Sequence, residues 1–585
     1  MTPVPSLARH PISVTEAQVY VTRTAARMRI QLFAEDLFLF HGLEPDARDI
    51  LSPEQLRSGL QQHRQFLLDK VKLRDAKGEA FPGRVTDLQP FEIPDEGIAV
   101  DELMLHTAVY ELEFPFSEPP EFLTVQQDIS DENFIFPSEM KMVLHQAGTD
   151  LTYTESLKPG TAHTIRFDWN QPPLPDDATD ADWRQWLEKQ RQATLGITSY
   201  SSVYSFIYFE PAEVRHEVLI PLAALKTILP MQHTDPAFIE VEEQEAVRNL
   251  IREWLVDANP VTINDTAVKP EFTRIDFYGL DLKDFAQQAE QRRVSLANGR
   301  VGIIMTYRYA DEAIRRAVVT WDTFHSSIRK VHSVIISGND EMRKFEFSRF
   351  NEAADNQVEW AADLQDLPKE PEEVAAVVPG RPVLTIPVLS CVLLTISVVL
   401  LSKCGKNQRT AVTVSAILAV LTLPAAQWQV PHPWKPLPEI SDADGIFRKL
   451  HQGAYGALAF GTEEQIYDAL ETAVDGSLLE SLYLQLHESL RIREQGGAVA
   501  RVRSVDYNDG RVISRESTPI EWPGFRYRST WTVAGTVEHW GHIHERQNRF
   551  TALFDVRPEK GAWKITSMQV EDQENVSSRT SLRKF

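Results

Sequence analysis

Cysteine is nearly absent from this chain of 585 residues, since only Cys391 and Cys404 occur. Both lie in or beside an apolar segment, so the polar remainder of the chain can hold no disulfide of its own. Basic residues are also in deficit: 60 lysines and arginines against 84 acidic residues give a net charge of −24. Because nucleic-acid binding needs basic patches that neutralise phosphate, this deficit argues against a nucleic-acid partner.

Signature motifs of common enzymes are missing as well. The sequence holds no G-x-S-x-G, no Walker loop, no G-x-G-x-x-G, no H-E-x-x-H and no C-x-x-C. These absences argue against the common hydrolases, nucleoside triphosphatases, dehydrogenases and zinc proteases, and they leave an unusual enzyme open. The sequence therefore favours a protein that is not an enzyme.

Two long apolar runs stand out from an otherwise ordinary composition. Residues 382–402 read PVLTIPVLSCVLLTISVVLLS, and residues 410–428 read TAVTVSAILAVLTLPAAQW, both without a charge. An apolar helix of about 20 residues spans the hydrocarbon core of a bilayer. Residues 382–428 therefore predict a two-helix transmembrane hairpin in a lipid bilayer. Buried core helices, or a re-entrant second segment because of Pro424, are the alternatives.

The loop between the two runs sets the predicted topology. Lys403, Lys406 and Arg409 crowd the loop at 403–409, and positively charged loops face the cytoplasm. The N- and C-terminal domains would then be extracytoplasmic, which requires an export signal. The start, MTPVPSLARHPIS, has no apolar stretch, although PSLA is typical of the end of a cleaved signal. We expect that a signal is missing from this start; the alternative is a cytosolic N-terminus with the loop outside.

Alternating apolar residues predict two β-rich domains before the hairpin. Residues 1–170 carry short strand-like segments such as SVTEAQVYVT, and one helical insert capped by Ser52. A proline-rich linker with a short helix occupies 171–195, and a second β-rich domain occupies 196–365. Repeated short strands favour sandwiches of the immunoglobulin type. Residues 366–381 are expected to form an acidic stalk that leads to the membrane.

The last region changes the order of the elements. Three amphipathic segments over 442–494 precede strand-like segments over 498–572. Helices followed by an antiparallel sheet predict an α+β domain at 437–576, with a tail at 577–585. Within it, Thr462 and Gln465 have the spacing of a capping box.

Part of this region resembles a known superfamily. The run WTVAGTVEHWGHIHERQNRFTALFDVRPEKGAWKITSMQV is similar to the strand set of NTF2-like, or cystatin-like cone, domains. The resemblance covers 437–576 and implies a cavity between helices and sheet that can bind a small molecule. Tyr467, His487 and Trp531 are candidates to line that cavity, and core packing is the favoured explanation for all three.

A second resemblance concerns the start of the chain. HPISVTEAQVYV and DLFLFHGLEPD resemble the exported domain of HupE/UreJ-type membrane proteins. Those proteins continue into a multi-helix metal permease, which this chain lacks. The whole arrangement resembles a bacterial membrane-protein family.

Three histidines crowd the stretch HWGHIH at 539–544. If Trp540 and Gly541 are the two turn residues of a hairpin, the flanking histidines pair across the strands and all three share one face. Three imidazoles are enough for zinc or copper. However, tryptophan is a poor residue for a tight turn, and a longer loop would scatter the ligands. An exposed hairpin tip is therefore favoured, and the alternative is a metal site formed by His539, His542 and His544.

Three hypotheses for the function follow. The leading one is a non-catalytic membrane-anchored protein that presents extracytoplasmic domains to a protein or ligand partner. The second is capture or delivery of a metal through the C-terminal histidine cluster, which predicts stoichiometric metal. The third is an enzyme that uses the cavity of the cone domain, which predicts an enclosed titratable residue with a perturbed pKa.

Overall fold

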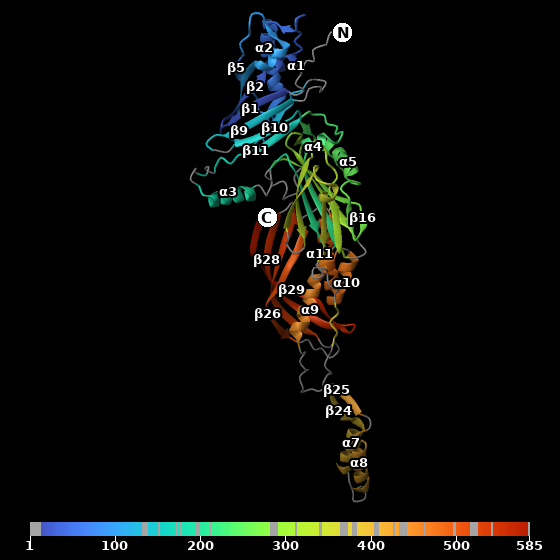
Figure 1. Cartoon of the computed structure of the whole chain (residues 1–585). Helices are drawn as coiled ribbons and strands as arrows, with labels where there is room; N and C mark the ends of the chain where they lie inside the picture. The colour runs from blue at the N-terminus through green and yellow to red at the C-terminus, as the bar shows by residue number, and fades with distance from the viewer. Residues whose placement is uncertain are drawn as a thin grey trace.

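The structure is a computed structural model. It describes residues 13–130, 138–149, 152–170, 174, 178–193, 199–210, 212–280, 291–309, 313–337, 342–362, 372–376, 383–402, 409–424, 427–431, 442–460, 463–494, 499–514, 524–539 and 542–582. The molecule is elongated: two β-rich domains, a C-terminal domain and a helical arm follow one another along its length (Figure 1). The expected export signal falls before residue 13 and lies outside the described residues.

The first domain combines a six-stranded sheet, a three-stranded sheet and two helices. The sheet orders are β10-β9-β1-β2-β7-β5 and β11-β8-β4, with a short β3-β6 pair. The strands are β1 Ser13–Val21, β2 Ala25–Phe33, β3 Ile50–Leu51, β4 Val71–Arg74, β5 Arg84–Gln89, β6 Ile98–Ala99, β7 Thr107–Pro115, β8 Phe122–Gln127, β9 Ser138–Gln146, β10 Thr152–Leu157 and β11 Thr161–Arg166. The helices are α1 Ala34–His41 and α2 Pro53–Lys70.

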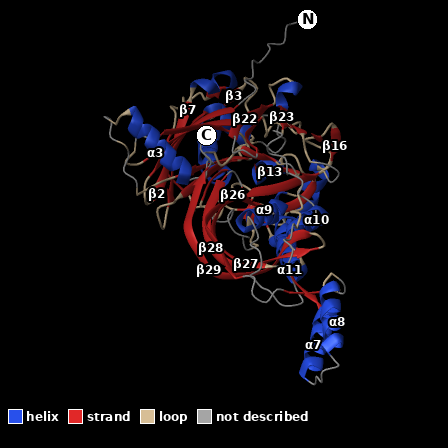
Figure 2. Ribbon diagram, turned by 90° about the horizontal axis from the view of Figure 1, so that it is seen from below, coloured by secondary structure: helices blue, strands red, loops and turns tan. Residues whose placement is uncertain are grey.

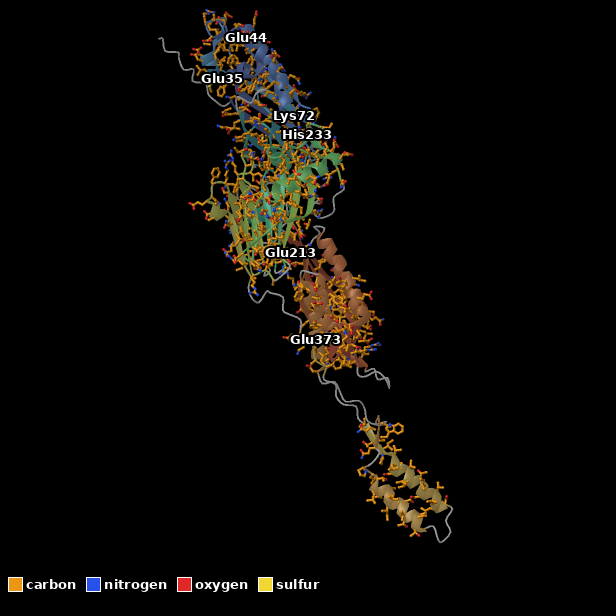
Figure 3. The ribbon with its side chains drawn as sticks, turned by 90° about the vertical axis from the view of Figure 1, so that its right-hand side faces the viewer. Glu35, Glu44, Lys72, Glu213, His233 and Glu373 are labelled. Atoms are coloured by element: carbon orange, nitrogen blue, oxygen red, sulfur yellow. The ribbon has the colours of Figure 1, made fainter. Side chains whose placement is uncertain are left out.

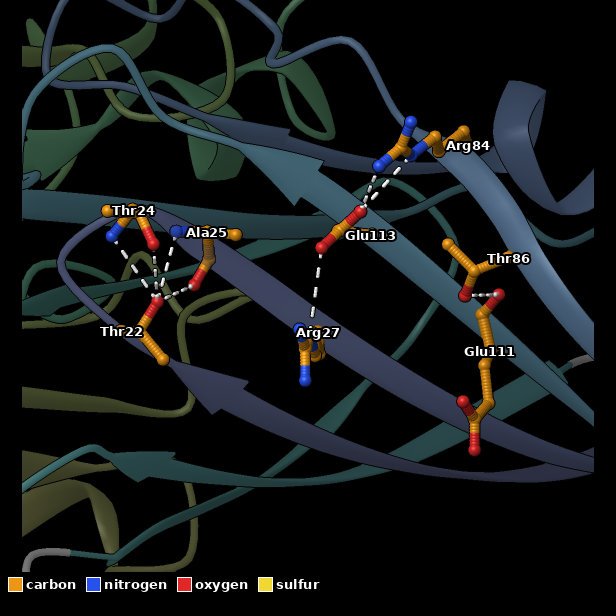
Figure 4. Close-up of polar contacts among 8 residues, drawn as sticks. All are labelled: Thr22, Thr24, Ala25, Arg27, Arg84, Thr86, Glu111 and Glu113. Atoms are coloured by element: carbon orange, nitrogen blue, oxygen red, sulfur yellow. Dashed lines mark hydrogen bonds and ion pairs between the residues drawn. The ribbon is translucent and has the colours of Figure 1, made fainter.

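Alternation along the strands gives the larger sheet one buried and one exposed face. In β2, Met28 and Ile30 are buried, whereas Arg27 and its alternate neighbours are exposed. Charged side chains pair across the exposed face: the Glu113 carboxylate accepts from Arg84 at 2.6 Å and lies 3.7 Å from Arg27 (Figure 4). This face is therefore a solvated one in which cross-strand ion pairs replace apolar packing.

The predicted helix cap at Ser52 is confirmed. The Ser52 hydroxyl accepts from the Gln55 amide nitrogen at 3.3 Å, and the Gln55 side-chain oxygen accepts from the Ser52 amide at 2.9 Å. This reciprocal pair satisfies two backbone donors that the first turn of a helix leaves free. Helix α2 therefore begins at Pro53, directly after the cap.

The second domain follows helix α3 (Asp180–Ala193) and repeats the topology of the first. Its sheets run β17-β19-β13-β12-β21-β22 and β16-β15-β20-β23, with a short β14-β18 pair. The strands are β12 Val203–Phe209, β13 Glu213–Pro221, β14 Phe238–Ile239, β15 Val261–Ile263, β16 Thr266–Val268, β17 Glu271–Tyr278, β18 Val294–Ser295, β19 Arg300–Arg308, β20 Arg316–Thr320, β21 Lys330–Ser337, β22 Met342–Ser348 and β23 Gln357–Ala361. Helices α4 Leu222–Lys226 and α5 Gln244–Leu255 follow β13.

The two larger sheets match strand for strand. An antiparallel pair at the centre, β1-β2 or β12-β13, is flanked by a strand parallel to its first member, β9 or β21. In both domains a short helix, α1 or α4, comes directly after the second strand, and a longer one, α2 or α5, follows after a short strand. The β-rich character of both regions is as expected, but the parallel pairing departs from the all-antiparallel immunoglobulin pattern.

The C-terminal domain places three helices before a four-stranded antiparallel sheet. The helices are α9 Ala443–Gly456, α10 Glu463–Ala473 and α11 Gly476–Glu494. The strands β26 Val499–Ser514, β27 Phe525–His539, β28 His542–Glu559 and β29 Ala562–Leu582 pair in sequence order. The strands curve and the helices lie on their concave side (Figure 2). The predicted cap at Thr462 lies outside the described residues, and the segment expected as a tail is in β29 as far as Leu582.

Residues 372–376, the described part of the segment expected as an acidic stalk, pack against the C-terminal domain. Ala375 forms a bridge to Ala562 at the start of β29, and the Trp563 amide donates to the Val374 carbonyl at 2.7 Å. The Lys564 ammonium lies 3.4 Å from Glu373 and fixes the segment further. Residues 372–376 therefore form part of the base from which the arm leaves the domain.

The arm replaces the predicted transmembrane hairpin. It consists of a ribbon, β24 Val383–Pro387 paired with β25 Gln427–Pro431, and two helices, α7 Val388–Ser402 and α8 Arg409–Leu421. It projects from the end of the molecule farthest from the first domain (Figures 1 and 3).

The prediction of two membrane spans over 382–428, and with it the membrane part of the fold class and the localisation, is wrong. Among the residues that the structure describes, no helix is both long and apolar enough to cross a bilayer. The helices have 15 and 13 residues, against the roughly 20 that a span requires. The physical reason is that the five residues of β24 and the five of β25 are extended and pair with each other. This pairing leaves fewer residues of the apolar runs for the two helices.

Candidate functional site

The histidine-rich turn lies where β27 meets β28. The register pairs His539 with His542, and Val537 with His544. This is the register expected for a two-residue turn, and it puts the three histidine positions on one face of the sheet. The side chains of these histidines lie outside the described part, so metal binding stays a prediction. Among the described side chains, no group of three potential ligands gathers at one point.

The interior of the C-terminal domain is organised around His451 of α9. Its side chain is buried, and its Nδ1 lies 2.9 Å from the Tyr507 hydroxyl of β26. Burial disfavours the imidazolium and lowers the pKa of His451 to about 4. The rings of Trp531 and Phe447 stand 4.8 and 5.1 Å from the imidazole, so the residue is a neutral member of an aromatic cluster.

Polar groups continue from His451 to the surface. The Arg448 guanidinium lies 5.1 Å from the centre of the Tyr507 ring and pairs with Asp444 at 2.8 Å. Asp444 also accepts a hydrogen bond from the Tyr527 hydroxyl. No buried side-chain polar atom lacks a partner in the described part of this domain. This is the pattern of a packed interior, because a ligand site usually presents a polar group that awaits its partner.

The three residues expected to line the cavity do not lie together. Trp531 is buried, and its Nε1 donates to the Tyr455 hydroxyl at 3.1 Å. Tyr467 lies on the outside, 40% exposed, against Tyr483. The side chain of His487 lies outside the described residues. Among the described members of this set, only Trp531 therefore reaches the interior. The sequence interpretation missed His451, although its place on the buried side of an amphipathic helix could have indicated it.

The arm carries the most unusual surface of the molecule. Twelve large aliphatic side chains of α7 and α8 are between 39% and 69% exposed. They are Leu389, Val392, Leu394, Ile396, Val398, Val399, Leu401, Val414, Ile417, Leu418, Val420 and Leu421. Contiguous exposed apolar surface of this kind marks an interaction site, whereas single exposed aliphatic residues are normal.

The polar groups of the arm are used between its own helices. The hydroxyls of Ser397 and Ser415 lie 2.5 Å apart, and those of Ser390 and Thr422 lie 3.1 Å apart. Ser390 and Ser397 are buried in this contact. Because these hydroxyls satisfy one another between the helices, the large side chains on the outward surfaces of both helices are aliphatic.

Comparison with known proteins adds little. No family model matches the chain, and no curated protein matches it. A solved structure, the intermembrane space region of the chloroplast protein ARC6, aligns with 23% of this chain and 98% of its own length. Its sequence identity is 16% and its TM-score is 0.18, which is too low to carry an argument. The resemblances to NTF2-like and HupE/UreJ-type domains remain predictions.

Proposed function

We propose that this chain is a non-catalytic assembly protein whose arm docks against the arm of a second copy. The observation that supports it is the exposed aliphatic surface of α7 and α8. The two β-rich domains lie at the other end of the molecule (Figure 3). Assembly through the arms leaves those domains free to meet a protein or ligand partner.

The size of the apolar surface fits a dimer. A fully buried aliphatic side chain corresponds to roughly 60–120 Å² of surface, at 25 cal/mol per Å² and 1.5–3 kcal/mol. Twelve such side chains, each about half exposed, present on the order of 500 Å² per arm. Two arms together could bury at most about 1,000 Å² of it, which is the lower bound for a specific interface.

The chemistry of the arm fits a second arm better than a polar surface. Helix α7 has no charged residue, and the only one in α8 is its first, Arg409. The partner therefore needs no complementary charge, but it must be apolar along two helices. A second arm meets that condition, because its helices have the same 15 and 13 residues, and a two-fold axis pairs identical surfaces. Four helices would then pack as a bundle.

The test is sedimentation velocity of the full chain in detergent-free buffer over a range of concentrations. We expect a dimer for the natural chain and a monomer for Leu394→Gln combined with Ile417→Gln, both about half exposed on the arm. The matched control is Leu105→Gln with Phe350→Gln, which changes two exposed apolar residues outside the arm and should leave the dimer intact. A monomeric natural chain, a dimer that survives the arm substitutions, or an arm that binds phosphatidylcholine vesicles in place of a second copy would each overturn the proposal.

A second candidate, metal capture at the histidine-rich turn, is supported by the pairing of His539 with His542. Two histidine positions paired across a hairpin, with a third two residues on, lie on one face of the sheet, and three imidazoles are enough for zinc or copper. Its test is the metal content of the full chain, described below.

A further inference from the structure

Arg300 lies at the seam between the two β-rich domains, as the first residue of β19. Residues of the two domains contact each other across this seam. The Phe122 ring of the first domain meets the Tyr200 ring edge-on at 5.4 Å. The Asn298 amide donates to the Thr124 hydroxyl of the first domain at 3.2 Å. Arg300 therefore stands on a surface that both domains cover.

The guanidinium of Arg300 has no counter-charge among the residues that the structure describes. The residue is 1% exposed, and neither its Nε nor its Nη2 has a hydrogen-bond partner. The face of the Tyr200 ring lies 4.5 Å from the guanidinium. The Tyr200 hydroxyl is buried and also has no hydrogen-bond partner in the described part of the chain. No carboxylate among the described residues forms an ion pair with Arg300, although buried charges are ordinarily paired.

The two free donors form one edge of the guanidinium, and other arginines of the chain show what that edge binds. In the C-terminal domain, Arg526 donates from Nε and Nη2 to the two oxygens of Asp555 at 2.7 and 3.2 Å. Arg84 uses the same two nitrogens on Glu113 at 3.1 and 2.6 Å (Figure 4). The edge that Arg300 leaves free is therefore the edge that binds an oxyanion in two-point fashion.

Another buried arginine of the same sheet has a carboxylate partner. On the adjacent strand, Arg215 lies 2.7 Å from Glu217, and both side chains are buried. Arg300 differs from Arg215 in having aromatic neighbours where a carboxylate is needed. Unpaired donors on a buried charge cost free energy, which favours a partner from outside the chain.

We propose that the seam holds a small oxyanion, a carboxylate or phosphate group, on the Nε and Nη2 edge of Arg300, with the Tyr200 hydroxyl as an additional donor. The remainder of the ligand would extend along the seam between the domains. Both ligand groups come from the second domain, but the Phe122 ring of the first domain packs on Tyr200, so binding would also strengthen the contact between the domains. This proposal is independent of the arm.

The test is thermal unfolding of the full chain with increasing sodium phosphate or sodium acetate, at constant pH and with sodium chloride keeping ionic strength constant. We expect a saturable rise of the unfolding midpoint with one of the two oxyanions, and the identity of that oxyanion distinguishes the phosphate from the carboxylate. Arg84→Met, which removes an exposed arginine, is the control for the lost charge and should keep the rise.

Arg300→Met should abolish the rise. Arg300→Lys should weaken the apparent affinity about tenfold, because an ammonium cannot make the two-point contact. Tyr200→Phe keeps the ring and removes only the hydroxyl, so it tests the site if Arg300→Met fails to fold, and it should weaken binding several-fold. An equal rise in Arg300→Met, unchanged affinity in both Arg300→Lys and Tyr200→Phe, or a natural chain that responds to phosphate and acetate no more than to chloride would overturn the proposal.

Discussion

Replacing Arg300 by methionine should stabilise the anion-free protein. Burial lowers the pKa of Arg300 to about 10, well below its usual value, which means that the folded chain holds the cation less favourably than the unfolded chain does. At neutral pH this difference corresponds to about 3 kcal/mol of lost stability. Methionine fills a similar elongated volume without a charge. We therefore expect the free energy of unfolding to rise by about 2–3 kcal/mol in Arg300→Met.

Arg215, the buried arginine with a carboxylate partner, provides a comparison in which the free energy of unfolding should fall. Glu217→Gln keeps Arg215 buried and removes the carboxylate at 2.7 Å, the largest of its favourable charge interactions, which should cost about 3 kcal/mol. Both substitutions remove one charge from the same sheet. Arg300→Met removes a buried charge that has no counter-charge among the described side chains, whereas Glu217→Gln removes the counter-charge of a buried arginine. The two substitutions should therefore change the free energy of unfolding in opposite directions.

Calorimetry of the full chain in buffer without phosphate or carboxylates measures both variants. For a domain of 150–250 residues, each kcal/mol moves the unfolding midpoint by about 2–4 °C, so Arg300→Met should unfold roughly 4–12 °C higher. The prediction is refuted if Arg300→Met lowers the temperature at which the β-rich domains unfold, because the guanidinium would then have a stabilising contact. A neutral Glu217→Gln would contradict the charge argument for the whole sheet face.

Three further predictions concern the C-terminal domain. The pKa of His451 is about 4 when folded and 6.5 when unfolded, so the unfolded chain binds more protons between these values and stability should fall by about 3 kcal/mol as pH falls through this window; urea unfolding of His451→Phe should lack that slope. A β-carbon at Gly510 would overlap the Tyr527 hydroxyl, so Gly510→Ala should cost about 2 kcal/mol in the same assay, and Tyr527→Phe should recover part of it. Mass spectrometry should find about one zinc or copper per chain if the histidine-rich turn binds metal. That metal should be absent after alanine substitution of His539, His542 and His544.

Local features of the fold were predictable from the sequence. Alternation in SVTEAQVYVT predicts a strand, and β1 occupies that segment. Ser52 predicts the start of a helix, and it caps α2. In each case the signal lies within a few residues of the element. The pairing of His539 with His542 belongs to the same class, because a hairpin register depends only on its turn.

Long-range pairing was not predictable. Strand β1 lies parallel to β9, more than a hundred residues later, and nothing in either segment names its neighbour. The same limit explains the arm: apolar composition predicts helices over 382–428, but the pairing of Val383 with Pro431 takes residues from both runs into a ribbon. The same limit applies to the surroundings of Arg300. The sequence shows an arginine at the start of an apolar strand, but it cannot show that no described carboxylate lies close enough to pair with it.

The repeated topology of the two β-rich domains has a consequence for how the chain folds. Tandem copies of one topology can exchange equivalent hairpins and misassemble. Here the β1-β2 hairpin has one charged face, whereas β12 and β13 are buried on both faces. A first-domain hairpin in the second sheet would bury Arg27 and Arg29 without partners, at a cost of several kcal/mol each. Divergence between the copies thus protects each nascent domain from taking up the wrong hairpin.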